Sequence, residues 1–321
     1  MLSQSEEEKA REILNKIKNP VDVTIIKNSH DFTASLEGFA KKIRALNNKI
    51  NINTTSLGSS SRPGIIIGDN IVYHALPTEM ELEPFLNTLT RLSEGDAELD
   101  DEIAHKIEHI EDRVEIIVFV MPVCPHCAKV VERVNQFAIQ NNNIQVYVID
   151  VAQFQEMGSD YKVTSAPTVV INQKIKLLSP STEELLEWIE KRDDELEYFG
   201  KLLQEGEMDG LKETIAEDLD KTKMLVDLLK KEEINIRIGA VILITSLMED
   251  HPEKLEAVKT RVKELLTENN TNIVQDAALV LGRIGDRSDI EELKALISSD
   301  DEEIRDAAEE AIEEINSKEG T

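Results

Sequence analysis

The chain has 321 residues, of which 40% are hydrophobic and 31% charged, as in folded globular proteins rather than disordered ones. Its formal net charge of −28 opposes binding to nucleic acid and to anionic membrane surfaces. Aromatic residues make up only 4% of the chain, so no stacking platform for bases or sugars is indicated.

The beginning of the chain is polar and acidic and lacks the apolar stretch of a signal peptide. No segment approaches the roughly 20 apolar residues of a membrane span. We therefore expect a cytoplasmic protein without a membrane partner. In such a compartment structural disulfides are disfavoured, which bears on the two cysteines.

Helical and strand patterns alternate in the first part of the chain. Apolar residues at helical spacing predict a helix within residues 1–20, which Pro20 ends. Residues 21–98 then read as strand, helix, strand, proline-led strand, strand and helix. The predicted elements are Val21–Ile26, Ala34–Asn47, Lys49–Thr54, Gly64–Gly68, Ile71–Tyr73 and Thr78–Leu92.

The same order repeats in residues 99–198, after a predicted linker helix at Leu99–Ile110. The elements expected there are Val114–Val120, Ala128–Asn141, Ile144–Asp150, Val169–Asn172, Lys174–Leu178 and Thr182–Lys191. Alternation of strands and helices predicts an α/β sheet in both units.

Residues 199–321 show no strand pattern. Three segments of this region can be superimposed, with matching small and matching branched positions. The small positions are Ala240, Ala277 and Ala308, and the branched ones are Ile244, Leu281 and Ile312. With the motif Leu281-Gly282-Arg283-Ile284-Gly285-Asp286, these segments resemble HEAT repeats, although Val274 stands where arginine is usual. The resemblance implies an all-α solenoid and a protein partner for this acidic tail, whose charges otherwise form a solvated face.

The two cysteines of the chain stand together as Cys124-Pro125-His126-Cys127, between a predicted strand and a predicted helix. At a helix N-terminus, unpaired N–H groups and the helix dipole favour the thiolate form of the first cysteine. Cys124 is therefore the expected nucleophile, and Cys127, one turn later, is the resolving cysteine. Pro125 suits the first helical position, and a positive charge on His126 would stabilise the thiolate and make the disulfide more oxidising.

Val118 to Cys127, followed about 40 residues later by Ser165-Ala166-Pro167-Thr168, resemble the thioredoxin fold. The resemblance implies a cis peptide bond before Pro167, which places this loop against the sulfur atoms. It also implies that residues 166–168 bind an extended substrate chain through the backbone of Ala166. The fold class is thus α/β, with two tandem thioredoxin-like units followed by an all-α HEAT-repeat solenoid.

Two consecutive units, the first without cysteines, resemble prokaryotic protein disulfide oxidoreductases and the N-terminal domain of alkyl hydroperoxide reductase flavoproteins. The latter pass electrons to a peroxiredoxin. Two residues depart from thioredoxin itself: Val118 replaces a buried aspartate, and Val123 replaces a tryptophan. A base for Cys127 is therefore not assigned, with Glu115 only a distant candidate.

Zinc binding is the main alternative for the cysteine pair, because His105 and His109 stand four residues apart on a predicted helix. An inert structural pair is the other. The setting of strand, cysteine pair, helix and later proline favours redox chemistry, so we expect no metal.

The first unit has Lys27 to Thr33 where the second has the cysteine motif, and Pro63 matches Pro167. Neither His30 nor Thr33 can exchange disulfides, so a structural or substrate-docking role is favoured.

These patterns predict an enzyme that exchanges dithiols and disulfides on protein substrates, with the tail recruiting partners. The reductase resemblance implies that a peroxiredoxin is one such substrate. No Gly-rich flavin or nicotinamide motif occurs, so we expect no cofactor beyond the redox-active disulfide, with electrons from a separate thiol reductase. The alternative is a redox-sensing interaction or scaffold protein with little turnover.

Overall fold

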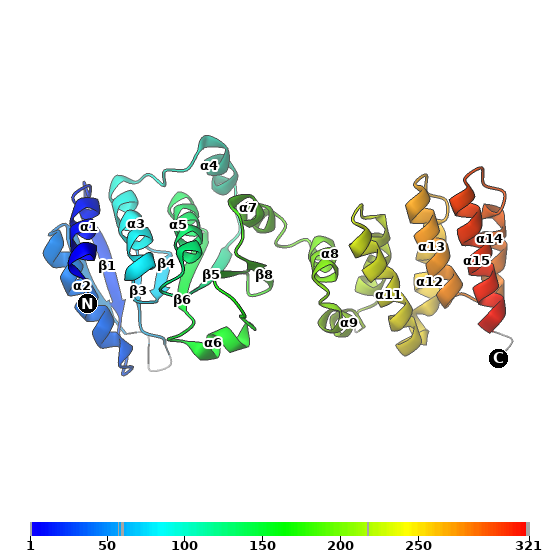
Figure 1. Ribbon diagram of the computed structural model, residues 1–321, viewed down its shortest axis with the longest axis horizontal. Helices are drawn as coiled ribbons and strands as arrows, with labels where there is room; N and C mark the ends of the chain where they lie inside the picture. The colour runs from blue at the N-terminus through cyan, green and yellow to red at the C-terminus, as the bar shows by residue number, and fades with distance from the viewer. Residues whose placement is uncertain (1, 57, 59–60, 217, 319–321) are drawn as a thin grey trace. The chain divides into compact units, whose positions relative to one another are not determined.

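The computed structural model describes residues 2–56, 58, 61–216 and 218–318 (Figure 1). The chain divides into two compact units, Met1–Arg192 and Asp193–Thr321. The first unit is a sheet covered by helices and the second is helical, which confirms the predicted fold class. Among the described residues, no helix is long and apolar enough to cross a bilayer.

The described residues of the first unit form eight strands, with helices between them. Its elements are α1 (Gln4–Leu14), β1 (Val21–Ile26), α2 (Phe32–Leu46), β2 (Ile50–Thr55), β3 (Gly64–Ile67), β4 (Ile71–His74), the 3-10 turn η1 (Glu79–Glu81), α3 (Leu82–Glu94), α4 (Asp101–Glu108), β5 (Val114–Val120), α5 (Pro125–Gln140), β6 (Ile144–Asp150), α6 (Gln155–Asp160), β7 (Thr168–Ile171), β8 (Ile175–Leu178) and α7 (Thr182–Glu190).

These strands form a single sheet in the order β2-β1-β3-β4-β6-β5-β7-β8. The order within the first four strands recurs in the last four, as the sequence repeat implies. The two halves meet where β4 pairs in parallel with β6, with Tyr73 opposite Val148. The boundary expected between residues 98 and 99 therefore divides two sequence repeats but not two separate cores. Pairing covers what would otherwise be two exposed strand edges.

Buried polar contacts also join the halves. The Asn135 side chain on α5 donates hydrogen bonds to the Tyr73 hydroxyl at 2.7 Å and the Thr88 hydroxyl at 2.9 Å. Arg91 on α3 forms an ion pair with Glu132 on α5. The helices α1, α3 and α5 lie side by side on the sheet (Figure 1). Because each contact spans about 40 residues or more, the two repeats are folded as one body.

Where the structure describes it, the second unit contains no strands and consists of helices. They are α8 (Glu195–Glu205), α9 (Met208–Ala216), α10 (Leu219–Asp227), η2 (Leu228–Lys230), α11 (Ile234–Asp250), η3 (Pro252–Lys254), α12 (Leu255–Leu265), α13 (Thr271–Ile284), η4 (Arg287–Asp289), α14 (Ile290–Leu296) and α15 (Glu302–Lys318). The tail expected from residue 199 begins earlier, because α8 crosses that position and its Phe199 and Leu203 pack into the second core.

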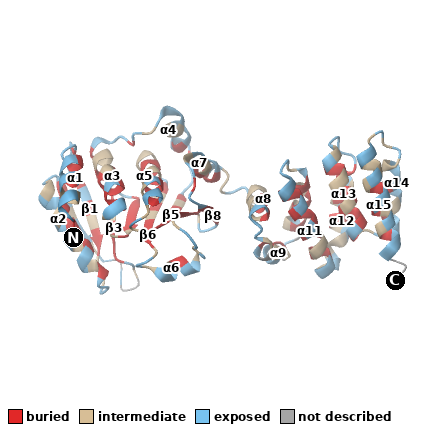
Figure 2. Ribbon diagram, in the orientation of Figure 1, coloured by how far each residue is buried: buried red, intermediate tan, exposed pale blue. Residues whose placement is uncertain are grey.

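The three matched segments of the sequence are α11, α13 and α15. Figure 2 shows buried and exposed residues along these helices. Their matched alanines are all fully buried, which lets neighbouring helices approach closely. Gly282 serves the same purpose, because a Cβ atom there would lie 2.9 Å from Cα of Ala311 on α15. The residues that repeat in the sequence are therefore those that set the spacing of the helices.

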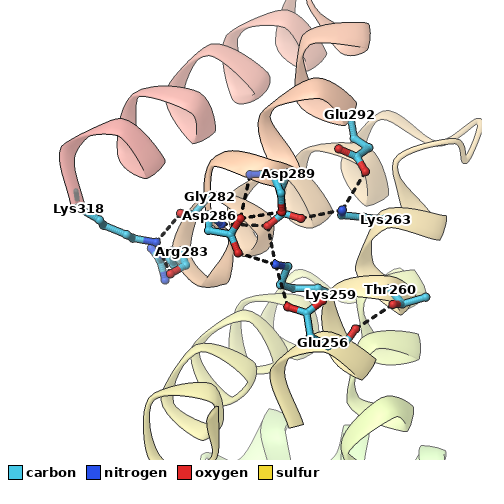
Figure 3. A network of polar contacts seen from close by, with 11 residues as sticks. Glu256, Lys259, Thr260, Lys263, Gly282, Arg283, Asp286, Asp289, Glu292 and Lys318 are labelled. Carbon is cyan, nitrogen blue, oxygen red and sulfur yellow. Dashed lines mark hydrogen bonds and ion pairs between the residues drawn. The ribbon is translucent and has the colours of Figure 1, made fainter. Parts of the chain in front are cut away.

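A buried ion network ties α12 to the turn after α13 (Figure 3). The ammonium of Lys259 lies 2.8 Å from the Asp289 carboxylate and 2.9 Å from that of Asp286. Lys263 approaches the other oxygen of Asp289 at 2.6 Å. Burial alone would raise the pKa of Asp289, but the two lysines and the Asp286 N–H group hold it below its usual value. This network is structural, since each buried charge in it has an opposite charge.

Candidate redox site

Cys124 and Cys127 lie at the junction of β5 and α5. The backbone of Cys124 is extended and forms the N-cap of α5, while Pro125 occupies the first helical turn. The N–H group of Cys127 donates a hydrogen bond to Sγ of Cys124 at 3.2 Å. The N-terminus of α5 thus points a backbone N–H donor at the first sulfur.

The two thiols differ in their access to solvent. Cys127 is completely buried, whereas Cys124 is partly exposed, and both are free. Burial, and the proximity of Cys124, raise the pKa of the Cys127 thiol far above its usual value. Cys124 is therefore the sulfur that a partner can reach, and Cys127 needs a base before it can attack.

The loop that contains Pro167 lies against the cysteines. The Ala166–Pro167 peptide bond is cis, as the thioredoxin resemblance implies, and is the only such bond in the described part of the chain. The Cys124 thiol donates to the carbonyl oxygen of Ala166 at 3.5 Å. Thr168 is buried and its hydroxyl donates to the Ser165 carbonyl at 2.7 Å, so its side chain shapes this loop and does not face solvent.

His126 occupies an exposed position on the first turn of α5. Three apolar side chains at or beside the cysteine motif are also exposed: Val123 is 67% exposed, Met121 44% and Met80 47%. Met80 belongs to the first sequence repeat, and its N–H group donates to the carbonyl of Pro122 at 3.3 Å. The rim of the site is thus assembled from both repeats.

Glu81 is a buried acid of this site that the sequence did not reveal. It ends the turn η1, which contacts α5, and only 1% of its surface is exposed. Neither carboxyl oxygen has a hydrogen-bond partner among the described residues. Burial, with repulsion from Asp150, raises the pKa of Glu81 to about 8, and its charge in turn raises the pKa of Cys127.

A buried carboxyl without a hydrogen-bond partner costs free energy when it is ionised, so burial favours the protonated form of Glu81. Glu79, Glu81 and Glu83 alternate with apolar residues in a predicted surface helix, and no sequence pattern distinguishes the middle one. Only the pairing of β4 with β6 brings η1 to α5. Glu115, the candidate considered from the sequence, lies on β5 at the end of the strand far from the cysteines.

The first repeat's loop, residues 27–33, makes local and packing contacts. Asn28 accepts a hydrogen bond from the His30 N–H group at 2.9 Å, and His30 accepts one from the Phe32 N–H group at 3.1 Å. The rings of His30 and Phe32 pack against Phe154 of the second repeat. These contacts are structural, and the substrate-docking role stays a prediction for this loop.

The histidines considered as zinc ligands lie apart from the cysteines. The rings of His105 and His109 are 4.2 Å apart on α4, centroid to centroid. Within the described ranges, no three His, Cys, Asp or Glu side chains form a group able to hold a metal ion.

Known families match both parts of the chain. Residues 114–190 match the thioredoxin domain, and residues 222–313 match HEAT repeats. A thioredoxin from Methanocaldococcus jannaschii is 32% identical over 82 residues, which cover 25% of this chain and 96% of that protein. An alkyl hydroperoxide reductase protein of Pseudomonas aeruginosa is 25% identical over 168 residues, which are 50% of this chain and 32% of that protein.

Solved structures share the fold of the first unit. The NTD_N/C domain of alkyl hydroperoxide reductase from Enterococcus faecalis gives a TM-score of 0.55 at 17% identity, over 59% of this chain and 100% of that one. A protein disulfide oxidoreductase from Aeropyrum pernix gives 0.54 at 20% identity, over 60% and 94%. The chain spans about a third of the length of the alkyl hydroperoxide reductases that it matches in sequence.

The fold and the cysteine site define a tandem thioredoxin-fold protein that continues into HEAT repeats. The chain belongs to the thioredoxin family. The resemblances to the thioredoxin fold and to HEAT repeats, inferred from the sequence, are thereby confirmed.

Proposed function

We propose that this chain is a protein dithiol–disulfide oxidoreductase in which Cys124 attacks, Cys127 resolves and Glu81 accepts the proton of Cys127. The thioredoxin family and the reductase relatives support a thiol–disulfide redox role. The observation that carries the finer proposal is the buried Glu81, which has no hydrogen-bond partner among the described residues and whose charge raises the pKa of the buried Cys127 thiol.

The first step is attack by the Cys124 thiolate on one sulfur of a substrate disulfide. A mixed disulfide forms, and the other substrate sulfur leaves as a thiolate. The N–H group of Cys127 stabilises the attacking thiolate. The apolar rim of Met80, Met121 and Val123 excludes water from the sulfur atoms once a substrate covers it.

In the second step Cys127 loses its proton to the Glu81 carboxylate and attacks Sγ of Cys124. The Cys124–Cys127 disulfide forms and the second substrate thiolate leaves, so the substrate gains the two electrons that the pair loses. Glu81 in its ionised form serves as general base, and a pKa near 8 suits proton exchange with a thiol. The same steps in reverse oxidise a substrate dithiol.

The extended substrate backbone would lie along residues 166–168, as in strand addition. Each cycle in the reducing direction requires new electrons, which we assign to a separate thiol reductase in the cytoplasm. The proposed substrates are protein disulfides or dithiols, and a peroxiredoxin is one of them because two of the relatives are alkyl hydroperoxide reductases.

Reduction of insulin disulfides with dithiothreitol tests the activity. We expect turnover by the wild-type chain and none above background with Cys124→Ser. Cys127→Ser should instead stop at the mixed disulfide, so that host proteins captured from an extract can be identified. The buried Trp188 reports by fluorescence that both variants are folded. Full activity of Cys124→Ser would overturn the proposal.

The second unit supports a second candidate, a redox-sensing interaction protein, because HEAT repeats stack into binding surfaces. In that case turnover would be negligible with every thiol donor, and affinity for a partner would change when the cysteines are oxidised. Capture of one peroxiredoxin by Cys127→Ser would instead indicate peroxide reduction, and many clients would indicate general disulfide exchange.

A further inference from the structure

Three isoleucines on α11 face solvent in a row. Ile234, Ile238 and Ile242 are 59%, 51% and 46% exposed, and their spacing of four residues places them on one side of the helix. The opposite side of α11 is also apolar and is packed into the core. A helix that is apolar on all sides is normally buried on all sides, so the exposed row is a surface that a partner covers.

The same positions can be found on the next two repeat helices. The matched alanines fix the rotation of α11, α13 and α15, so residues at equal offsets from them share one face of the unit. Contacts between neighbours confirm this stacking: Arg237 on α11 lies 2.7 Å from Asp276 on α13, and Gln275 on α13 donates to Glu303 on α15.

The chemistry of this face changes from one helix to the next. On α11 it is apolar, on α13 it is mixed, and on α15 it is acidic and exposed. The three sets are Ile234, Ile238 and Ile242; Thr271, Gln275 and Leu279; and Glu302, Asp306 and Glu310. We call these nine residues the graded face.

At its acidic end the graded face contains a groove between α13 and α15. Leu279, Ala307 and Ala311 contribute its apolar lining, while Asp306 and Glu310 are among the carboxylates along it. Long side chains that end in a positive charge fit such a groove, because their methylene groups contact the apolar lining and their charged ends meet the carboxylates.

We propose that the graded face binds a helical segment of a partner protein that is apolar at one end and rich in lysine or arginine at the other. The apolar end covers the three isoleucines of α11, and the basic end enters the groove beside α15. Stacked helices lie roughly 10 Å apart, so the path from α11 to α15 is about 20 Å, the length of about 13 helical residues.

A labelled synthetic helix of about 16 residues, slightly longer than this path, tests the proposal, with leucines at every fourth position in one half and lysines in the other. Its binding to the full chain is followed by fluorescence anisotropy. We expect saturable binding that weakens as salt increases, and little binding by a peptide with glutamate in place of each lysine. Ile238→Glu should weaken binding at least tenfold, because one buried isoleucine contributes roughly that factor.

Charge reversal at the other end provides a matched comparison. Asp306→Lys with Glu310→Lys changes two carboxylates that line the groove, and should also weaken binding at least tenfold. Glu309→Lys with Glu313→Lys makes the same change of charge on the same helix, at exposed residues outside the groove lining, and should leave affinity within twofold.

Equal effects of the two double variants would contradict the proposal, as would equal binding of the lysine and glutamate peptides. Sedimentation velocity identifies the competing occupant, a second copy of this chain. A wild-type dimer that Ile234→Glu converts to monomer, with no peptide binding, would overturn the proposal in favour of self-association. Circular dichroism confirms folding of each variant, and the outcome is independent of the cysteines.

Discussion

Asp289 in the second unit and Glu81 in the first are both buried carboxyl groups, with 0% and 1% of their surfaces exposed. Asp289 lies within 3 Å of two lysine ammonium groups, and its pKa is lowered. Glu81 has no hydrogen-bond partner in the described part of the chain, and its pKa is raised to about 8. A buried acid surrounded by cations holds structure together, whereas one left without them is positioned to exchange a proton.

Removing Lys259, which is paired with the buried Asp289, should have the largest effect on stability. Lys259→Met leaves Asp289 paired with Lys263 and removes the ammonium beside Asp286, so it should lower the free energy of unfolding of the second unit by up to about 3–5 kcal/mol. Circular dichroism during urea unfolding measures this. Lys223→Met removes an exposed pair with Asp220 and serves as the control, with an expected loss below about 0.5 kcal/mol.

Removing the buried acid Glu81 should stabilise the folded protein. In the unfolded chain Glu81 ionises near pH 4.5, but the folded protein holds the proton until about pH 8. Folding is therefore penalised progressively between these values. The advantage of Glu81→Gln over wild type should grow by about 1.4 kcal/mol per pH unit in this window and level off above it.

Urea unfolding followed by Trp188 fluorescence at pH 5 and pH 8 measures this difference, because the lone tryptophan of the chain lies in the first unit. Glu79→Gln changes an exposed acid two residues away and should follow wild type at both pH values. An advantage of Glu81→Gln that is constant with pH would show that Glu81 is not protonated in the folded protein.

A smaller effect is expected at the edge of the ion network. Asp286 is half exposed and caps η4, accepting a hydrogen bond from the Ser288 N–H group at 2.8 Å. Hydrogen bonds from Ser288 and from Lys259 lower the pKa of Asp286, so its contribution is present at neutral pH and is lost as pH falls through that lowered value. Asp286→Ala should cost about 1 kcal/mol at pH 7, measured by urea unfolding, and less in strong acid. A loss as large as that of Lys259→Met would contradict the expectation that a half-exposed member of the network contributes less than a buried one.

The sequence predicted the features that depend on neighbours along the chain. Periodicity identified the strands and most helices of the first unit, and the alanines common to α11, α13 and α15 identified the repeat. The cysteine motif, with Pro167 about 40 residues later, indicated the redox site. The short partner helices α12 and α14 were missed, because their apolar residues are few and separated by charges.

Features that depend on packing between distant segments could not be predicted. The single eight-stranded sheet requires the edges of β4 and β6 to pair, and neither strand specifies its partner. That pairing brings Glu81 from the cysteine-free repeat to the cysteines of the other. In the function proposed above, Glu81 would serve as the base in place of the aspartate that thioredoxin has where this chain has Val118.

The rate of the second thiol step as a function of pH tests the role of Glu81 most directly. With 5,5′-dithiobis(2-nitrobenzoic acid), the reduced chain should release two thiolates, the first from attack by Cys124 and the second when Cys127 closes the disulfide. We predict that the second rate in wild type rises through about pH 8 and then levels off. In Glu81→Gln it should be about 100-fold slower at pH 8 and still rising above it, with the first rate unchanged. Superimposable second-phase profiles would contradict the assignment of Glu81 as the base for Cys127.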